Sequence, residues 1–246
     1  MPRFFVGTPL ACGDVIQLPD DVNRHVQVLR LQSGDAITLF NGNGGEFSAE
    51  VVEMERRGST VRIDDFRDVE AEPPYQLTLA QGIAGSDKMD WLIEKAVELG
   101  ASAFAPLTTT RSVVRLSGER AQRRQAHWQR IVQAACEQCG RNRLPEVLPT
   151  RELATWLGTM PKTPEEGELR LLLSPRASVP FAELTTEPPK LRALVLIGPE
   201  GGFSAAEEAA ATSHGFTAVG LGPRVLRTET AGIAVLSALA ARWGGW

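Results

Sequence analysis

The residues best suited to chemistry in this chain stand in two glycine-containing segments near its carboxyl end. Residues 198–204 (GPEGGFS) follow the apolar run 194–197, and Ser204 with Glu207 has the spacing of a helix capping box. Residues 221–231 (LGPRVLRTETA) carry two arginines and a glutamate. The apolar run is typical of a strand buried in a parallel sheet. Because ligands bind beyond the carboxyl ends of such strands, we predict that both segments share one site.

The spacing of these glycines excludes the two commonest nucleotide-binding motifs. The chain contains neither G-x-G-x-x-G nor G-x-x-x-x-G-K-[ST], and its last lysine is Lys190. A dehydrogenase or a P-loop kinase is therefore excluded. The predicted cradle offers mainly backbone hydrogen bonds, which suit an uncharged or cationic nucleoside. The alternative, that the glycines only shape tight turns, is less favoured because two such segments follow one another and carry Arg224, Arg227 and Glu229.

These segments closely resemble the signature loops of SPOUT methyltransferases, and more narrowly those of RsmE-type 16S rRNA uridine-N(3) methyltransferases. The resemblance extends to residues 88–100 (KMDWLIEKAVELG), 137–145 (EQCGRNRLP) and the start Arg3-Phe4-Phe5, and covers essentially the whole chain. It implies an α/β architecture: a trefoil-knotted C-terminal domain with S-adenosylmethionine in the knot, and an N-terminal PUA-like β-barrel domain. It also implies an obligate homodimer.

The resemblance assigns the two glycine segments to the cofactor, S-adenosyl-L-methionine. The residues expected to hold it are Leu173, Ile197, Gly198, Pro199, Gly201, Gly202, Leu221, Gly222, Val225, Leu226, Thr230 and Ala231. A positive sulfonium explains why no basic side chain need point into the cradle. No metal is expected, because the methyl donor is already activated.

Methyl transfer to N3 of a uridine requires the proton on that nitrogen to leave. An arginine over the uracil carbonyl oxygens would stabilise the developing anion, and Arg227 is our first candidate for this role. Glu229 or Glu200 could accept the proton or hold Arg227 in place, and the sequence does not separate them. Glu200 has a second interpretation, as an acid favoured near a helix terminus by the helix dipole.

The predicted RNA-facing residues are mostly arginines. Only four of the 26 basic residues are lysines, and residues 111–143 contain eight arginines against two glutamates. Arginine matches phosphate oxygens and stacks on exposed bases. The alternative is that these arginines solvate one face of a helix. The candidate substrate contacts are Arg3, Arg24, Arg30, Lys88, Arg111, Arg141 and Asn142, and the partner that the resemblance implies is 16S rRNA or the small ribosomal subunit.

Composition indicates a cytoplasmic protein. The chain has 246 residues, 43% of them hydrophobic, and a net charge of −4 that argues against indiscriminate binding of nucleic acid. No apolar stretch is long enough to span a bilayer, and no secretory signal is recognisable. Three cysteines form no even disulfide framework. Cys136 and Cys139 are spaced as C-x-x-C, but no matching second pair exists for a zinc site, so we expect them to pack.

The elements that would position these residues fall into two predicted domains, 1–72 and 73–246, separated by Pro73-Pro74. In the first we expect strands over 36–40, 46–54 and 59–66, with a turn at Arg57-Gly58, and a short helix within 20–31. In the second we expect strands over 75–82, 103–107, 169–173, 194–197 and 216–222. Helices are expected over 87–99, capped by Ser86, from 117 to about 139, from a cap at Thr150 to 157, from 205, and over 230–242.

Two other functions remain open. One is a SPOUT methyltransferase acting on another RNA position, such as a tRNA ribose; the resemblance of the first domain argues against it. The other is a non-catalytic RNA-binding or ribosome-assembly factor with the same fold. Intact glycines together with Arg227 and Glu229 argue against it, because a pure binder would not need this loop chemistry.

Overall fold

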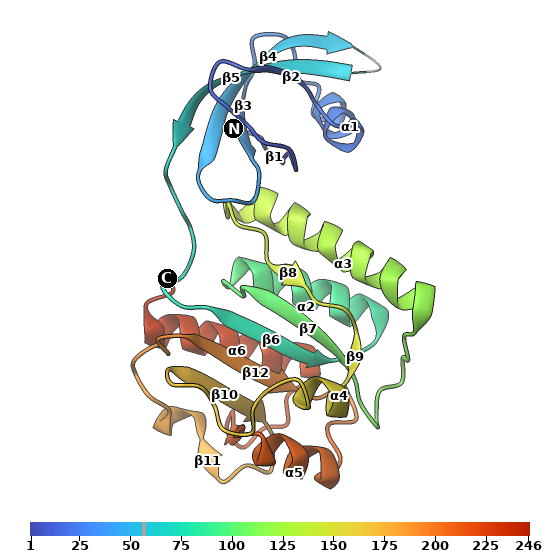
Figure 1. Ribbon diagram of the computed structural model, residues 1–246, viewed down its shortest axis with the longest axis vertical. Coiled ribbons are helices and arrows are strands. Elements are labelled where there is room, and N and C mark those ends of the chain that lie inside the picture. The colour runs from blue at the N-terminus through green and yellow to red at the C-terminus, as the bar shows by residue number, and fades with distance from the viewer. Residues whose placement is uncertain (56–57) are drawn as a thin grey trace. The chain divides into compact units, whose positions relative to one another are not determined.

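The structure of the chain, a computed structural model, describes residues 1–55 and 58–246 (Figure 1). It divides into two compact units, one formed by residues 1–72 and 136–144, the other by 73–135 and 145–246. Arg57, for which a turn is predicted, lies outside the described residues. Within the described part, no helix is both long and apolar enough to cross a membrane.

The first unit is a small β-sheet with one helix. Its elements are β1 (Arg3–Phe5), β2 (Val15–Gln17), α1 (Asp20–Val28), β3 (Ala36–Phe40), β4 (Glu46–Glu55) and β5 (Gly58–Arg67). The strand order is β1-β3-β4-β5-β2, with β1 parallel to β3 and the other pairs antiparallel. Alternate apolar residues of β3, β4 and β5 pack with α1 in one core. The three longer strands and the helix confirm the predictions; β1 and β2 are too short to show a period.

The second unit is a parallel α/β sheet. Its elements are β6 (Leu77–Gly82), α2 (Ser86–Glu98), β7 (Ala103–Thr108), α3 (Gly118–Cys139, whose last four residues belong to the first unit), β8 (Glu146–Val147), β9 (Arg151–Glu152), α4 (Leu153–Leu157), β10 (Glu168–Leu173), β11 (Val179–Pro180), η1 (Phe181–Glu183), β12 (Arg192–Ile197), α5 (Ala205–Ser213), β13 (Thr217–Gly220) and α6 (Thr228–Trp243).

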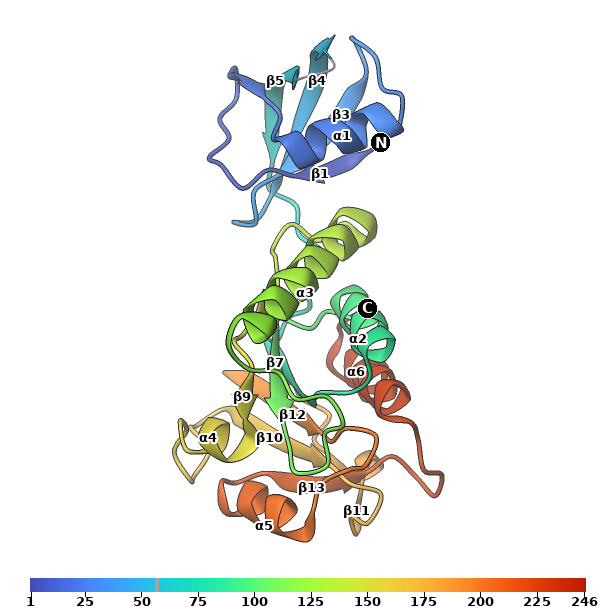
Figure 2. The same ribbon diagram turned by 90° about the vertical axis from the view of Figure 1, so that its right-hand side faces the viewer.

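Every strand pair in this second sheet is parallel, in the order β11-β13-β10-β12-β6-β7-β8, with β9 also pairing β7. The helices α2 and α6 lie side by side on one face, and α4 and α5 on the other (Figure 2). Strands covered on both faces must be apolar throughout, and residues 193–197 of β12 are all buried. Parallel pairing brings the carboxyl ends of β10, β12 and β13 to one edge of the sheet.

Local sequence signals explain most helix boundaries. Ser204 accepts a hydrogen bond from the backbone N–H of Glu207, whose side chain accepts one from the backbone N–H of Ser204, so α5 begins with the predicted capping box. Gly100 has φ +86° after the end of α2, as predicted. Two predicted caps are wrong. Gly85, not Ser86, occupies the cap position of α2, and α4 begins after Glu152 because the residues that follow Thr150 form β9.

A buried ion network lies at the amino-terminal end of β10. The Glu168 carboxylate accepts hydrogen bonds from Arg170 Nε at 2.9 Å and Arg192 Nε at 2.8 Å. Arg170 also donates to the carbonyl oxygens of Pro161 and His214, both at 2.7 Å. Burial alone would raise the pKa of Glu168, but the two arginines and a backbone N–H outweigh it and lower this pKa below its usual value. The network therefore fixes two ionised groups inside the unit.

Candidate functional site

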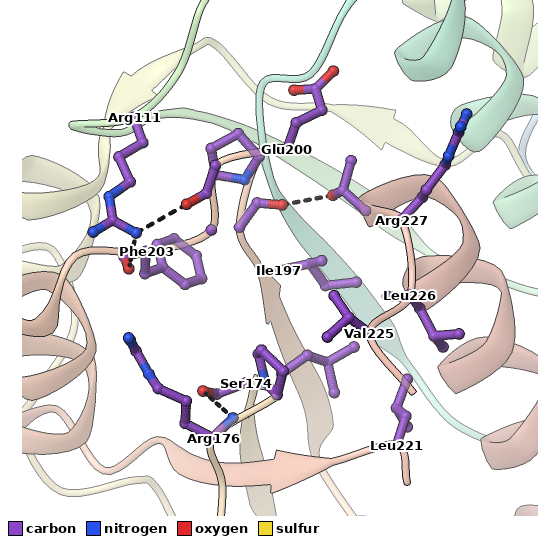
Figure 3. Close-up of a pocket in the computed structure, with 18 of the residues that line it drawn as sticks. Arg111, Ser174, Arg176, Ile197, Glu200, Phe203, Leu221, Val225, Leu226 and Arg227 are labelled. Atoms are coloured by element: carbon purple, nitrogen blue, oxygen red, sulfur yellow. Dashed lines mark hydrogen bonds between the residues drawn. The ribbon is translucent and has the colours of Figure 1, made fainter. Parts of the chain in front are cut away.

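A cavity of about 570 Å³ lies beyond the carboxyl ends of β10, β12 and β13 (Figure 3). Residues that follow these three strands line it, together with Lys88 of α2 and Arg111 of the segment after β7. This is the position at which open α/β sheets bind ligands, and the volume suits a molecule of nucleoside size. With the exception of Thr230, every residue predicted to hold the cofactor lines this cavity.

The glycines of the first segment are required by its geometry. The backbone N–H of Gly202 donates to the carbonyl of Pro199 at 2.8 Å, closing a tight turn. A Cβ on Gly198 would lie 3.0 Å from the Cα of Gly202, and Gly202 itself has φ +64°. Gly222, in the second segment, has φ +98°. Other residues would strain or crowd these positions, so the glycines keep the backbone exposed to a ligand.

A buried amide ties the two glycine segments together. Thr228 Oγ1, at the start of α6, donates to the carbonyl of Gly198 at 2.6 Å. The Nε2 of Gln81, on β6, lies 2.8 Å from Thr228 Oγ1 and 3.2 Å from the same carbonyl. Both side chains are buried. The sequence does not reveal Gln81 or Thr228 as site residues, because a polar residue in a strand and a threonine at a helix start have no distinctive spacing.

Arg111 holds the outer part of the first segment. Its Nη1 donates to the carbonyl oxygens of Gly201 at 3.0 Å and Phe203 at 3.2 Å. The backbone N–H of Thr110 donates to Glu207 Oε1 at 2.7 Å. Burial would raise the pKa of Glu207, but this bond and those from Ser204 lower it. Arg111, predicted to contact substrate, thus has a clear second role in shaping the cavity wall.

Glu200 is anchored at the start of α2. Its Oε1 accepts hydrogen bonds from the backbone N–H of Gly85 at 2.9 Å and from Lys88 Nζ at 3.1 Å. Burial acts to raise the pKa of Glu200, but backbone N–H groups and Lys88 outweigh it, so the pKa lies below its usual value. Glu229, the other predicted acid, lies in the first turn of α6 and outside the cavity lining. Its buried Oε2 has no hydrogen-bond partner among the described residues.

The cations at the cavity differ in how they are held. In Figure 3, Arg111 and Arg176 lie on one side of the cavity, and Arg227 and Leu226 on the other. Arg176 pairs with Glu208 at 3.0 Å, and Glu208 also accepts from Ser174. The side chains of Arg227 and Arg224 are exposed and make no hydrogen bond or ion pair with any residue that the structure describes. The sequence does not reveal Arg176 or Glu208 as site residues, because both lie outside the two glycine segments.

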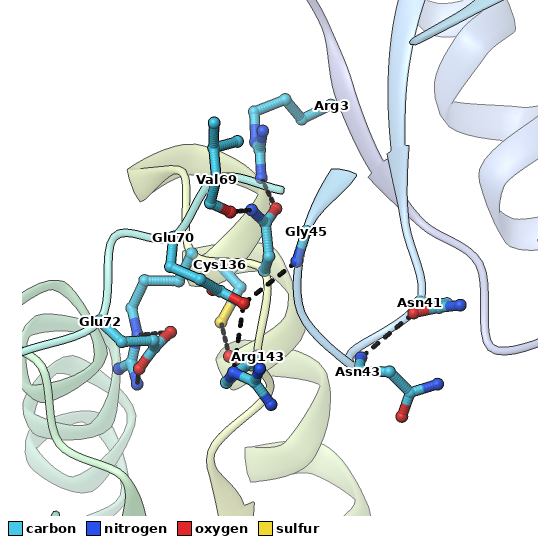
Figure 4. Close-up of polar contacts among 11 residues, drawn as sticks. Arg3, Asn41, Asn43, Gly45, Val69, Glu70, Glu72, Cys136 and Arg143 are labelled. Atoms are coloured by element: carbon cyan, nitrogen blue, oxygen red, sulfur yellow. Dashed lines mark hydrogen bonds and ion pairs between the residues drawn. The ribbon is translucent and has the colours of Figure 1, made fainter. Parts of the chain in front are cut away.

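The other predicted substrate contacts belong to the first unit, where most have partners of their own (Figure 4). Arg141 is 3% exposed and donates from Nε to Glu72 at 3.0 Å. Asn142 accepts from Arg3 Nη2 at 2.7 Å and donates to the carbonyl of Val69 at 2.7 Å. Arg3 also pairs with Glu46. The geometry therefore does not favour direct substrate contact by Arg3, Arg141 or Asn142, because each of these side chains already binds groups of the protein.

Arg24 and Arg30, on and just after α1, are the exposed members of the predicted set in this unit.

Cys136 is buried, and its Sγ donates to the carbonyl of Arg143 at 3.7 Å. Burial raises the pKa of this thiol to about 12, so it is neutral at physiological pH. Packing, the predicted role, accounts for it.

The chain is similar to two family models and to several known proteins. A family model described as an RNA methyltransferase domain matches residues 71–240, and one described as an RNA methyltransferase PUA domain matches residues 18–64. The ribosomal RNA small subunit methyltransferase E of Buchnera aphidicola is 32% identical over 99% of this chain and 97% of its own. The crystal structure of a ribosomal RNA small subunit methyltransferase E from Neisseria gonorrhoeae, bound to S-adenosyl methionine, is 37% identical to this chain with a TM-score of 0.91. The match covers 99% of this chain and 98% of that one. A Legionella pneumophila protein in complex with the same cofactor is 36% identical with a TM-score of 0.90, covering 97% and 96%.

Proposed function

The chain belongs to the ribosomal RNA small subunit methyltransferase E family, and from this premise we propose that it transfers a methyl group from S-adenosylmethionine to N3 of a uridine in 16S rRNA. The observation that carries the proposal is the cavity at the carboxyl edge of the parallel sheet, lined by both glycine segments. Two similar proteins were crystallised with this cofactor.

The residues present fit the cofactor. Apolar side chains of Leu173, Ile197 and Leu226 offer walls for an adenosine, and the turns at Gly198 and Gly222 expose backbone groups for its polar atoms. Arg111 binds a backbone carbonyl and Arg176 pairs with Glu208, so these two cations repel the positively charged sulfonium of the cofactor only weakly. When bound, the cofactor would supply a methyl group that is already activated for transfer.

Arg227 carries the main catalytic role in this proposal. It lines the cavity, is exposed, and has no partner among the described residues to neutralise it. A guanidinium beside the uracil carbonyl oxygens stabilises the negative charge that develops as the N3 proton leaves. Its position at the cap of α6 fixes its backbone next to the cofactor segment.

Glu200 is the better placed of the two candidate acids. It lines the cavity, whereas Glu229 does not. Its lowered pKa keeps it ionised at neutral pH, so it can accept a hydrogen bond from the N3–H and take up that proton as the methyl group is transferred. The same lowered pKa makes it a weak base, and for this reason we assign the larger part of the rate to anion stabilisation by Arg227.

We also propose that this chain has four further features of the family. These are a trefoil knot in the domain 73–246, a PUA-like RNA-binding role for the domain 1–72, a homodimer, and action in the cytoplasm where small subunits are assembled. The match of residues 18–64 to an RNA methyltransferase PUA model supports the second feature. Enzymes that act on the pairing edge of a base need it unpaired or flipped out, and an RNA-binding domain would present it. A fully active monomer in light scattering would contradict the dimer.

The test uses radiolabelled S-adenosylmethionine and small ribosomal subunits from cells that lack the native modification. The RNA is digested and the labelled nucleoside is identified by mass and chromatography. Label in 3-methyluridine at a single position of 16S rRNA is the expected result. Label in a different nucleoside would overturn the assigned position, and cofactor binding without any labelled RNA would favour a non-catalytic factor.

A further inference from the structure

A second pocket of about 420 Å³ lies in the same unit as the cofactor cavity but is lined by different residues. Its lining combines a small apolar surface with cationic side chains, and among the described residues that line it there is no carboxylate. The lining residues are Ile83, Ala84, Val114, Leu116, Arg120, Arg123, Arg124, His127 and Trp128. Four of the nine are arginine or histidine, although the chain as a whole has a net charge of −4.

The cationic wall is pre-organised from behind by one acid. Asp90, on α2, accepts from Trp128 Nε1 at 3.0 Å, and lies 2.8 Å from His127 Nε2 and 3.4 Å from Arg124. The Arg124 guanidinium also lies over the Trp128 ring, 5.5 Å from its centroid. A guanidinium held in this way loses less rotational freedom when it binds an anion.

The remaining two arginines are available to a ligand. Among the residues that the structure describes, Arg123 pairs with Glu119 alone, at 3.4 Å. Both side chains are more than three-quarters exposed, so the pair contributes little. The Arg120 side chain is exposed and makes no hydrogen bond or ion pair with the described residues. One acid, Asp90, therefore faces this wall from the neighbouring helix, and positive charge remains in excess.

The second pocket adjoins the cofactor cavity along the chain. Ile83 and Ala84 line the second pocket, and the next residue, Gly85, binds Glu200 of the first. Arg111 lines the first cavity, and Val114, three residues later, lines the second. The two sites therefore lie close together, so a strand that places a base in one passes near the other.

From this arrangement we propose that the second pocket binds a phosphodiester group of the RNA strand next to the target nucleotide. Arginine forks match phosphate oxygens, whereas the pocket has no acid to receive a cationic ligand. Trp128 is only 1% exposed, so it cannot stack on a base, and the contact is with the backbone rather than with the sequence. This inference rests on the proposed function for the identity of the strand.

The test compares Arg120→Gln with Arg130→Gln, a matched control because Arg130 is exposed on the same helix but does not line the pocket. Binding of the cofactor-loaded enzyme to purified 16S rRNA and to unmodified small subunits is measured over a range of salt concentrations, and methyl transfer is measured separately. Arg120→Gln should weaken binding to both about tenfold and reduce the salt slope by about one. It should raise KM for subunits while leaving kcat and cofactor affinity unchanged.

Equal effects of Arg120→Gln and Arg130→Gln, or none from Arg120→Gln, would overturn the inference. Loss of binding to assembled subunits but not to purified 16S rRNA would also overturn it, because the pocket would then face a ribosomal protein. Because binding is read without the reaction, methyl transfer to a different nucleoside would refute the proposed function and leave this result standing. Thermal unfolding of both variants checks that each is folded.

Discussion

The arginines of the segment 141–143 and the two arginines of the second glycine segment, Arg224 and Arg227, look alike in the sequence but differ in the structure in whether an acid pairs with them. Arg141 is buried against Glu72, and Arg143 pairs with Glu70 at 3.2 Å. Arg224 and Arg227 line the cavity, are exposed, and have no partner among the described residues. A buried arginine left without its acid destabilises the fold, whereas an exposed arginine without one is available to a substrate.

In these two segments, the presence or absence of a partner acid indicates the role of each arginine, whereas the arginine itself does not. Glu72 and Glu70 stand about seventy positions before the arginines that they neutralise. Nothing in the spacing of the arginines reveals those acids.

Removal of a buried partner acid should have the largest effect. Glu168→Gln leaves Arg170, which is 1% exposed, without its counter-charge. We expect the free energy of unfolding to fall by about 3–5 kcal/mol at neutral pH. Urea denaturation at pH 7 measures it. Cofactor binding at temperatures where the variant is folded should be retained, and a stability equal to wild type would show that the pair contributes nothing.

The same acid predicts a pH dependence. Because the folded protein lowers the pKa of Glu168 below its usual 4.5, this stabilisation is fully present above 4.5 and is lost as pH falls through the lowered value. Wild type should therefore lose stability below pH 4.5, and Glu168→Gln should show a shallower loss. Parallel curves for the two proteins would contradict the assignment.

Arg227→Ala should have the largest effect on activity without affecting the fold. We expect kcat to fall about 10²–10³-fold, as when a donor to a developing anion is removed, while cofactor affinity stays within about twofold. Single-turnover methyl transfer and calorimetry measure the two quantities. Arg224→Ala is the control from the same segment and should change kcat much less. Equal loss of rate and cofactor affinity would show that Arg227 is structural.

Gln81→Leu should weaken the cofactor site through the two segments that it joins. Loss of the buried amide leaves the Gly198 carbonyl and Thr228 hydroxyl with fewer partners, so we expect cofactor affinity to fall about tenfold. Thr228→Val should act in the same direction. The double variant should lose less than the product of the two single effects, because both changes break one network. Fully independent effects would contradict the connection.

Lys88→Met should have the smallest effect. Glu200 keeps its bond from the backbone N–H of Gly85, and the Lys88 side chain is about one-third exposed. We expect a change below about 1 kcal/mol in the free energy of unfolding and a rate within about threefold of wild type. A loss of rate comparable to that of Arg227→Ala would instead identify Lys88 as the principal cation of the reaction.

Local signals predicted much of the fold. The capping box at Ser204, the glycine after α2 and the apolar run of β12 each depend on neighbouring residues, and the structure confirms all three. Short strands such as β1 and β9 could not be predicted, because segments of three and two residues are too short to show the alternation of apolar and polar residues. In the site, segments rich in glycine were recognisable, whereas Gln81, Arg176 and Glu208 act through partners distant in sequence and therefore could not be read from spacing.

The pH dependence of single-turnover methyl transfer by wild type and Arg227→Ala tests most directly whether Arg227 stabilises a uracil anion. As pH rises toward the pKa of the uridine N3–H, more of the base is already ionised, so the need for the arginine decreases. We expect the Arg227→Ala rate to rise about tenfold per pH unit below that pKa and to approach the wild-type rate at the alkaline end. A constant ratio of the two rates across the whole range would contradict the proposed role.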